Sequence, residues 1–115
     1  ISPAMATVGG VLDIKPLLIV DDEGQLKVIK NIRGRKKSIK FLLNVFQNRV
    51  VNPEQQVIFI NHGDCQEDAI YLKKLLLEKF EVKDIKINYV VPTMGSHTGP
   101  DMLCLIFLSE SGDIN

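Results

Sequence analysis

Residues 57–91 constrain the fold more than any other part of the chain. A short apolar run at 57–61 is followed by a helical pattern at 66–80, and then by apolar side chains that alternate with polar ones over 85–91. A strand, a helix and a strand within about 35 residues form a βαβ unit, whose strands are parallel and joined by a right-handed crossover. Asp64 and Glu67 have the spacing of an N-terminal capping box for this helix.

A second amphipathic helix is predicted over residues 36–48. Apolar residues recur there at helical spacing, at Ile39, Leu42, Leu43, Phe46 and Val50. The unbroken apolar run 103–108 predicts a buried strand, and 14–33 predicts a hairpin around an acidic turn with glycine. Pro16 cannot donate to a strand ladder, so it marks the start or the edge of the first hairpin strand.

The first twelve residues are predicted to form a short helix. Ser2 would be its N-cap and Pro3 would occupy its first turn, where a missing N–H costs nothing. Together these elements predict an α/β fold over residues 1–115. It is a two-layer mixed β-sheet of about five strands with the helices packed on it.

Composition narrows the class of protein. The chain has 115 residues with 14 basic and 14 acidic side chains, so it has no net charge and is a poor candidate for binding a bulk polyanion. No apolar run approaches the roughly 20 residues of a membrane span, and the N-terminus lacks signal-peptide features. Cys65 and Cys104 are far apart, which favours reduced thiols and a cytoplasmic protein. Because the chain starts at Ile1 rather than methionine, we interpret it as part of a longer protein.

A polar loop between the last two predicted strands is the main candidate site. It contains five consecutive residues with turn-forming or hydrogen-bonding character: Gly95, Ser96, His97, Thr98 and Gly99. The strands of a βαβ unit end on the same side of the sheet, so His62 and this loop are expected at one rim. We predict a site for an anion or a carboxylate. The alternative is a tight turn whose histidine serves packing or solubility.

A basic cluster at the start of helix 36–48 is the second candidate. It places four cations in five positions, at Arg33, Arg35, Lys36 and Lys37. Cations at a helix N-terminus oppose the macrodipole, which indicates an anionic partner rather than helix stability. A solvated helix start is the simpler interpretation. A small phosphate- or nucleic-acid-binding domain is an alternative function, although the zero net charge and the lack of interleaved aromatics argue against it.

Catalytic and metal sites have less support. Ser96 beside His97 is not a nucleophile–base pair by adjacency, and no G-x-S-x-G elbow is present. A metal site from His62, Asp64, Cys65 and His97 is chemically conceivable, but no pair has zinc-site spacing. We therefore predict no enzymatic activity, no metal and no cofactor in this chain.

Several of these segments, in this order, resemble the C-terminal domain of DegV-family proteins. They are the run at 12–18, the Asp22-Glu23-Gly24 turn, Arg33 before the lysine-rich helix, His62-Gly63-Asp64 and His97-Thr98-Gly99-Pro100. The resemblance covers essentially all 115 residues. It departs from the family pattern at Asp101, where glycine is usual.

The resemblance implies a function. DegV proteins are bacterial fatty-acid-binding proteins with two α/β domains, and some are the acyl-carrying subunit of a fatty-acid kinase. It implies that a long-chain fatty acid lies between this domain and an N-terminal domain absent from the chain. His97 would bind the carboxylate, supported by Ser96 and Thr98. The basic cluster would contact the kinase.

Overall fold

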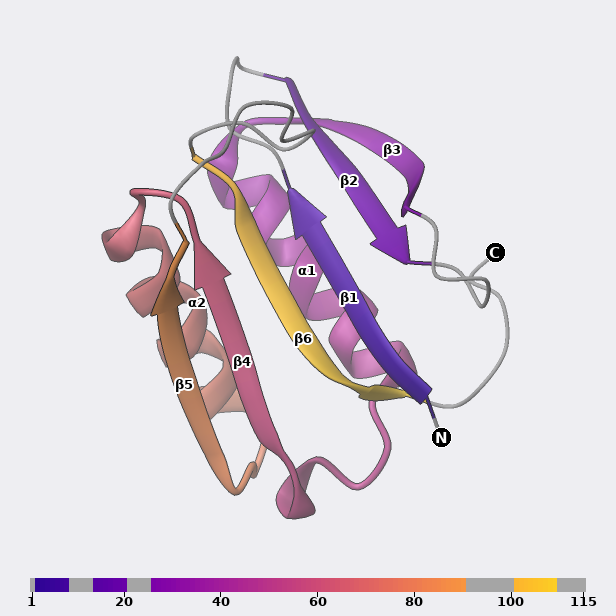
Figure 1. The fold of residues 1–115 in the computed structure, drawn as a ribbon, viewed down its shortest axis with the longest axis vertical. Coiled ribbons are helices and arrows are strands. Elements are labelled where there is room, and N and C mark those ends of the chain that lie inside the picture. Colours follow the sequence, from indigo (N-terminus) through magenta and orange to yellow (C-terminus); the bar gives the residue numbers. More distant parts are fainter. Residues whose placement is uncertain (1, 9–13, 21–25, 91–100, 110–115) are drawn as a thin grey trace.

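The computed structural model describes residues 2–8, 14–20, 26–90 and 101–109. The elements in chain order are β1 (Ser2–Val8), β2 (Ile14–Val20), β3 (Leu26–Arg33), α1 (Arg35–Arg49), a 3-10 turn η1 (Pro53–Gln55), β4 (Val57–His62), α2 (Gln66–Lys79), β5 (Asp84–Tyr89) and β6 (Leu103–Ser109). The six strands form one mixed sheet in the order β3-β2-β1-β6-β4-β5. Both helices lie on the same face of this sheet (Figure 1). The two-layer α/β prediction is confirmed, with six strands rather than about five.

The βαβ prediction is also confirmed. Strands β4 and β5 are parallel and pair in register from Val57 opposite Asp84 to His62 opposite Tyr89. Helix α2 packs on these two strands, while α1 covers β1, β2, β3 and β6. Strand β6 lies in the middle of the sheet, antiparallel to both β1 and β4.

The N-terminal segment forms strand β1, so the predicted helix is wrong. Residues 2–8 pair with β6 on one side and with β2 on the other. Ala4, Ala6 and Val8 are buried beneath α1, which is a period of two rather than 3.6. Alanine favours a helix intrinsically, but its small side chain also suits a central strand closely covered by a helix. Tertiary pairing therefore overrides local propensity at this position.

Strands β2 and β3 form the predicted antiparallel hairpin, with one register shift between Leu17 and Leu18. Pro16 lies one residue before Leu17, which pairs with the last residue of β1. It is the third residue of β2 and lies opposite Asn31 of β3, so it stands near the start of an interior strand rather than at a sheet edge.

The core lies between the sheet and the two helices. Phe46 of α1 is fully buried and meets Phe80 and Phe107 edge-on, each at a centroid distance of 5.0 Å. Such T-shaped pairs add roughly 0.5–1.5 kcal/mol each beyond area burial. Of the helices that the structure describes, none is long and apolar enough to cross a membrane.

The start of α2 differs from the predicted capping box. The N-cap residue is Cys65, and no side chain caps the helix by hydrogen bond. Asp64 has a left-handed backbone (φ 58°) and is exposed, so it belongs to the preceding turn. The acidic residues Glu67 and Asp68 lie in the first turn of the helix, where the macrodipole favours negative charge.

Candidate functional site

The carboxyl ends of β4 and β5 form one rim of the sheet. The amide of Val90 donates to the carbonyl of His62 at 2.8 Å, just after β5 ends. The amide of Gly63 donates to the carbonyl of Met102 at 3.0 Å, just before β6 begins. Val90 and Met102, which lie on either side of segment 91–100, are thus bonded to His62 and Gly63, consecutive residues at this rim.

The residues predicted to bind the ligand lie within that segment. Gly95, Ser96, His97, Thr98 and Gly99 are outside the described residues, and their roles stay predictions. Their predicted place at this rim requires β4 and β5 to be parallel, and these two strands are parallel.

His62 has a structural role at the rim. Its side chain is only 4% exposed, and its Nδ1 accepts the backbone N–H of Cys65 at 3.2 Å. Its ring also meets Tyr89 edge-on, at a centroid distance of 5.5 Å. Because Nδ1 is an acceptor, the proton of the neutral ring belongs on Nε2. Among the described residues, no three His, Cys, Asp or Glu side chains are grouped to hold a metal ion.

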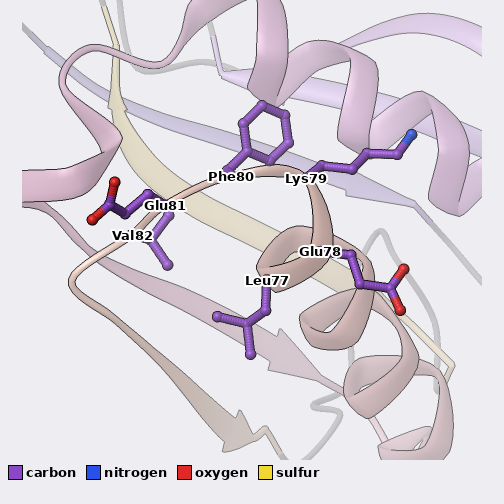
Figure 2. Close-up of a pocket in the computed structure, with 6 residues that line it drawn as sticks. All are labelled: Leu77, Glu78, Lys79, Phe80, Glu81 and Val82. Carbon is purple, nitrogen blue, oxygen red and sulfur yellow. The ribbon is translucent and has the colours of Figure 1, made fainter.

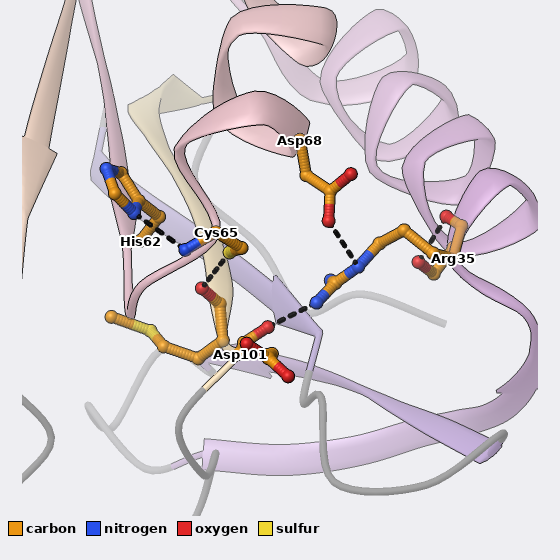
Figure 3. A network of polar contacts seen from close by, with 7 residues as sticks. Arg35, His62, Cys65, Asp68 and Asp101 are labelled. Carbon is orange, nitrogen blue, oxygen red and sulfur yellow. Dashed lines mark hydrogen bonds and ion pairs between the residues drawn. The ribbon is translucent and has the colours of Figure 1, made fainter.

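Arg35 joins three separate elements at this rim (Figure 3). Its Nε lies 3.1 Å from a carboxylate oxygen of Asp68 in the first turn of α2. Its Nη2 donates to the backbone carbonyl of Asp101, the first described residue after segment 91–100. The carbonyl of Arg35 in turn accepts the Ser38 hydroxyl at 2.7 Å, within the first turn of α1. The sequence pattern gave no signal for this network, because it joins residues up to 66 positions apart.

Cys65 also bonds to the backbone just before β6 begins. Its Sγ donates to the carbonyl of Met102 at 3.3 Å, beside the Gly63 bond to the same oxygen. Burial raises the pKa of the Cys65 thiol; the Arg35 charge opposes this rise, and Asp68 and Asp101 add to it. The thiol is therefore protonated at neutral pH and acts as a hydrogen-bond donor rather than a nucleophile.

An open hollow of about 400 Å³ lies beside this network. Its lining is dominated by carboxylates around a single guanidinium, and consists of Arg35, Asp64, Cys65, Gln66, Glu67, Asp68 and Asp101. Four carboxylates would repel the carboxylate of a fatty acid, so this hollow does not suit that ligand.

A second hollow, of about 500 Å³, lies at the C-terminal end of α2 (Figure 2). Its charged side chains, Glu78, Lys79 and Glu81, point in different directions rather than toward one point. A binding site needs polar groups that converge on a ligand, so this hollow is not a candidate.

The basic cluster divides into two groups. Lys36 and Lys37 are exposed on α1, whereas the Arg35 side chain is only 17% exposed and is used in the internal contacts above. Arg33 is the last residue of β3, and its side chain is outside the described residues. Gly34, between Arg33 and Arg35, is the N-cap of α1. Its φ of 89° is a backbone conformation that favours glycine.

The face of the sheet opposite the helices carries apolar side chains that no described element covers. Phe59 is 37% exposed and Leu108 is 44% exposed, with Met5, Val57 and Ile106 half-buried around them. A hollow of about 230 Å³ lies here, partly lined by Val57, Phe59, Ile106 and Leu108. We call this surface the open face.

Comparison with solved structures identifies the fold. The chain superposes on a DegV-family protein from Ruminococcus gnavus, solved with vaccenic acid, with a TM-score of 0.79. The sequences are 21% identical, and the match covers 90% of this chain and 44% of that one. It also superposes on the Streptococcus pneumoniae fatty acid kinase B3 protein loaded with linoleic acid, with a TM-score of 0.78. There the identity is 15%, over 95% of this chain and 45% of the other.

Comparison of sequences identifies the family. A DegV domain-containing protein of Clostridium perfringens is 46% identical over 111 residues. This alignment covers 96% of the chain but only 38% of the relative, so the chain spans well under half the length of that protein. The family model described as "Uncharacterised protein, DegV family" matches residues 1–110. The chain belongs to the DegV family.

Proposed function

We propose that residues 1–115 form the C-terminal domain of a two-domain protein that binds one long-chain fatty acid. The fatty-acid carboxylate accepts a hydrogen bond from His97, with Ser96 and Thr98 as further donors and Gly95 and Gly99 shaping the loop. The observation that carries this proposal is the match in fold to a DegV-family protein solved with vaccenic acid and to a fatty acid kinase B3 protein loaded with linoleic acid. The bonding of the flanking residues Val90 and Met102 at one rim supports a ligand site in the segment between them, with His97 as the carboxylate ligand.

The open face supports the proposal of a second domain. Contiguous exposed apolar surface on a small domain commonly marks an interaction site. Phe59 and Leu108 leave such a surface on the sheet, and the Clostridium relative is more than twice as long as this chain. In the proposed arrangement, the N-terminal domain covers the open face and supplies the hydroxyl donors that complete the carboxylate site.

We assign this chain a carrier role without catalysis. The Streptococcus neighbour is a fatty acid kinase B protein, which suggests a separate kinase as the partner here. Lys36 and Lys37 are exposed on the first turn of α1 and suit an acidic partner surface. Arg33 belongs to the same proposed docking surface, whereas the inward-turned Arg35 is left out of it.

Replacing His97 in the full-length protein tests the site. A buried carboxylate left without its donor costs about 1.5–3 kcal/mol, so His97→Ala should weaken oleic-acid affinity about 10- to 150-fold. The melting temperature of the ligand-free protein should change little. Titration calorimetry or a fluorescent fatty-acid displacement assay measures the difference.

Two variants sharpen this test. His97→Gln keeps a donor and should recover part of the lost affinity. Lys36→Glu with Lys37→Glu should leave oleic-acid affinity unchanged and weaken docking to an acyl kinase. If His97→Ala binds oleic acid as tightly as the wild type does, the loop is structural and the proposed site is wrong.

A further inference from the structure

Arg35 differs in burial from its neighbours Lys36 and Lys37 in the basic cluster. It is the first residue of α1, yet its side chain is turned inward and is only 17% exposed, whereas Lys36 and Lys37 are exposed. A cation that served only docking or solubility would gain nothing from this burial, because desolvation weakens it as a surface charge.

The guanidinium bonds to two acceptors from two different elements. Nε faces the carboxylate of Asp68 on α2, and Nη2 faces the carbonyl of Asp101 before β6 (Figure 3). A planar guanidinium presents donors in fixed, divergent directions, so it can hold both acceptors at once. The single nitrogen of a lysine at this position could pair with Asp68 but could not also reproduce the second bond in the same geometry.

The acceptor carbonyl of Asp101 marks where the chain rejoins the sheet. One residue later, the carbonyl of Met102 accepts both the Gly63 amide and the Cys65 thiol. Three donors, from α1, from the turn after β4 and from the start of α2, therefore converge on two consecutive carbonyls. Before segment 91–100, the bond that the structure describes is a single one, from the Val90 amide to the His62 carbonyl.

We infer that Arg35 is a positioning residue that fixes the point of re-entry at Asp101, rather than a member of the docking surface. Asp68 orients its guanidinium, and the pair ties the first turns of both helices to the backbone four residues after His97. The consequence for ligand binding rests on the proposed function: a displaced re-entry point moves the donor at position 97 away from the carboxylate.

Amide hydrogen exchange in the ligand-free, full-length protein tests the inference without any ligand. Arg35→Lys keeps the positive charge but removes the two diverging N–H donors of the guanidinium. The Gly63 amide should then exchange about tenfold faster, because the local opening that exposes it no longer breaks one charge-assisted hydrogen bond. The Val90 amide at the other end of the segment should change less than about twofold. Residue-resolved exchange by NMR measures both amides in one sample.

Two further variants make the result specific. Lys36→Gln is the matched control on the neighbouring exposed cation and should alter neither amide. Asp68→Asn retains Arg35 but removes its carboxylate partner, so it should accelerate Gly63 exchange by a smaller factor, about threefold. Asp68→Asn also tests the positioning role if Arg35→Lys fails to fold.

The outcomes separate this inference from the proposed function. Unchanged Gly63 exchange, or equal acceleration at Gly63 and Val90, would overturn the positioning role. In the ligand arm, Arg35→Lys should weaken oleic-acid affinity about fivefold, while Lys36→Gln leaves it unchanged. Faster Gly63 exchange with unchanged affinity would contradict the effect on the ligand. If the wild type does not bind oleic acid, the proposed function fails, and the exchange data alone still judge Arg35.

Discussion

The two faces of the sheet are built from alternate residues of the same strands, yet only one face is completed by this chain. On β4, Ile58 and Ile60 are fully buried under the helices, while Phe59 between them is 37% exposed. On β6, Leu105 is fully buried and Leu108 is 44% exposed on the opposite side. The covered face stabilises the domain, whereas the open face keeps apolar area that no described residue buries. The proposed second domain would account for this difference, since exposed contiguous apolar surface commonly marks an interaction site.

The largest expected effect comes from a matched pair on β4. Ile60→Ala removes a fully buried side chain under α2 and should destabilise the domain by about 2–5 kcal/mol. Phe59→Ala, one residue earlier, should cost only about 1–2 kcal/mol in the isolated chain, because 37% of this residue already faces solvent. Urea denaturation of both variants measures the difference.

The same pair then tests what covers the open face. In the full-length protein, Phe59→Ala should become more destabilising than it is in the isolated chain, since the second domain would bury the ring. Equal losses in the two contexts would mean that the open face stays exposed.

A smaller effect is expected at Gln56, which fixes the end of β6 between the two faces. Its side chain accepts the Leu108 amide at 2.8 Å and donates to the Leu108 carbonyl at 3.1 Å, and to the Val51 carbonyl. Gln56→Ala removes these bonds from the Leu108 amide and the Val51 carbonyl, while the Leu108 carbonyl keeps its bond from the Val51 amide at 3.3 Å. The variant should cost about 1–3 kcal/mol.

The exposed neighbour Gln55 provides the control for Gln56. Gln55→Ala should change stability by less than about 0.5 kcal/mol. Thermal unfolding of both variants would measure this contrast. Similar losses in the two would show that Gln56 does not hold Leu108 on the open face.

The smallest effect concerns Cys65, at the rim where the covered face ends. The pKa of its thiol is raised in the folded protein, so the unfolded chain releases this proton first as pH increases. The stability due to this thiol is therefore complete below the unfolded pKa of about 8.5 and is lost as pH rises toward the folded pKa.

Comparison with Cys65→Ala isolates the contribution of this thiol. Denaturation at pH 7.5, 8.5 and 9.5 should show a steeper fall of stability in the wild type than in the variant, while the Lys and Tyr titrations cancel in the difference. A parallel fall, or a steeper one in Cys65→Ala, contradicts the raised pKa.

Sequence periodicity predicted the elements that have a strong local pattern. The bounds of α1 and α2 lie within one residue of the predicted ranges 36–48 and 66–80 at each end. Apolar residues at helical spacing bury one stripe of a helix, and that requirement is visible in the sequence itself. Strand β1 was missed because Met5 between Ala4 and Ala6 hides the alternation, and because Ser2 and Pro3 are typical of a helix start. Its pairing partners, β2 and β6, decide its conformation.

The candidate site also has one part that was predictable from the sequence and one part that was not. The rim was predictable, because parallel strands must end at one edge of the sheet, and β4 and β5 do so. The division of the basic cluster was not predictable. In the sequence, the basic cluster forms one charge run. Only the placement of α1 and α2 on the same face of the sheet brings Arg35 to Asp68 and Asp101. A charge run records how many cations there are, but not which of them face acceptors distant in sequence.

The sequence by itself determined the α/β class, both helices, the parallel pair and the polar segment between β5 and β6, since each depends on periodicity or turn chemistry within one stretch of chain. The tertiary structure alone decided that residues 2–8 form a central strand, that Cys65 rather than Asp64 starts α2, and that Arg35 faces inward. Each of these depends on partners far away along the chain. The free energy of such contacts depends on packing and burial in three dimensions, which no local pattern encodes.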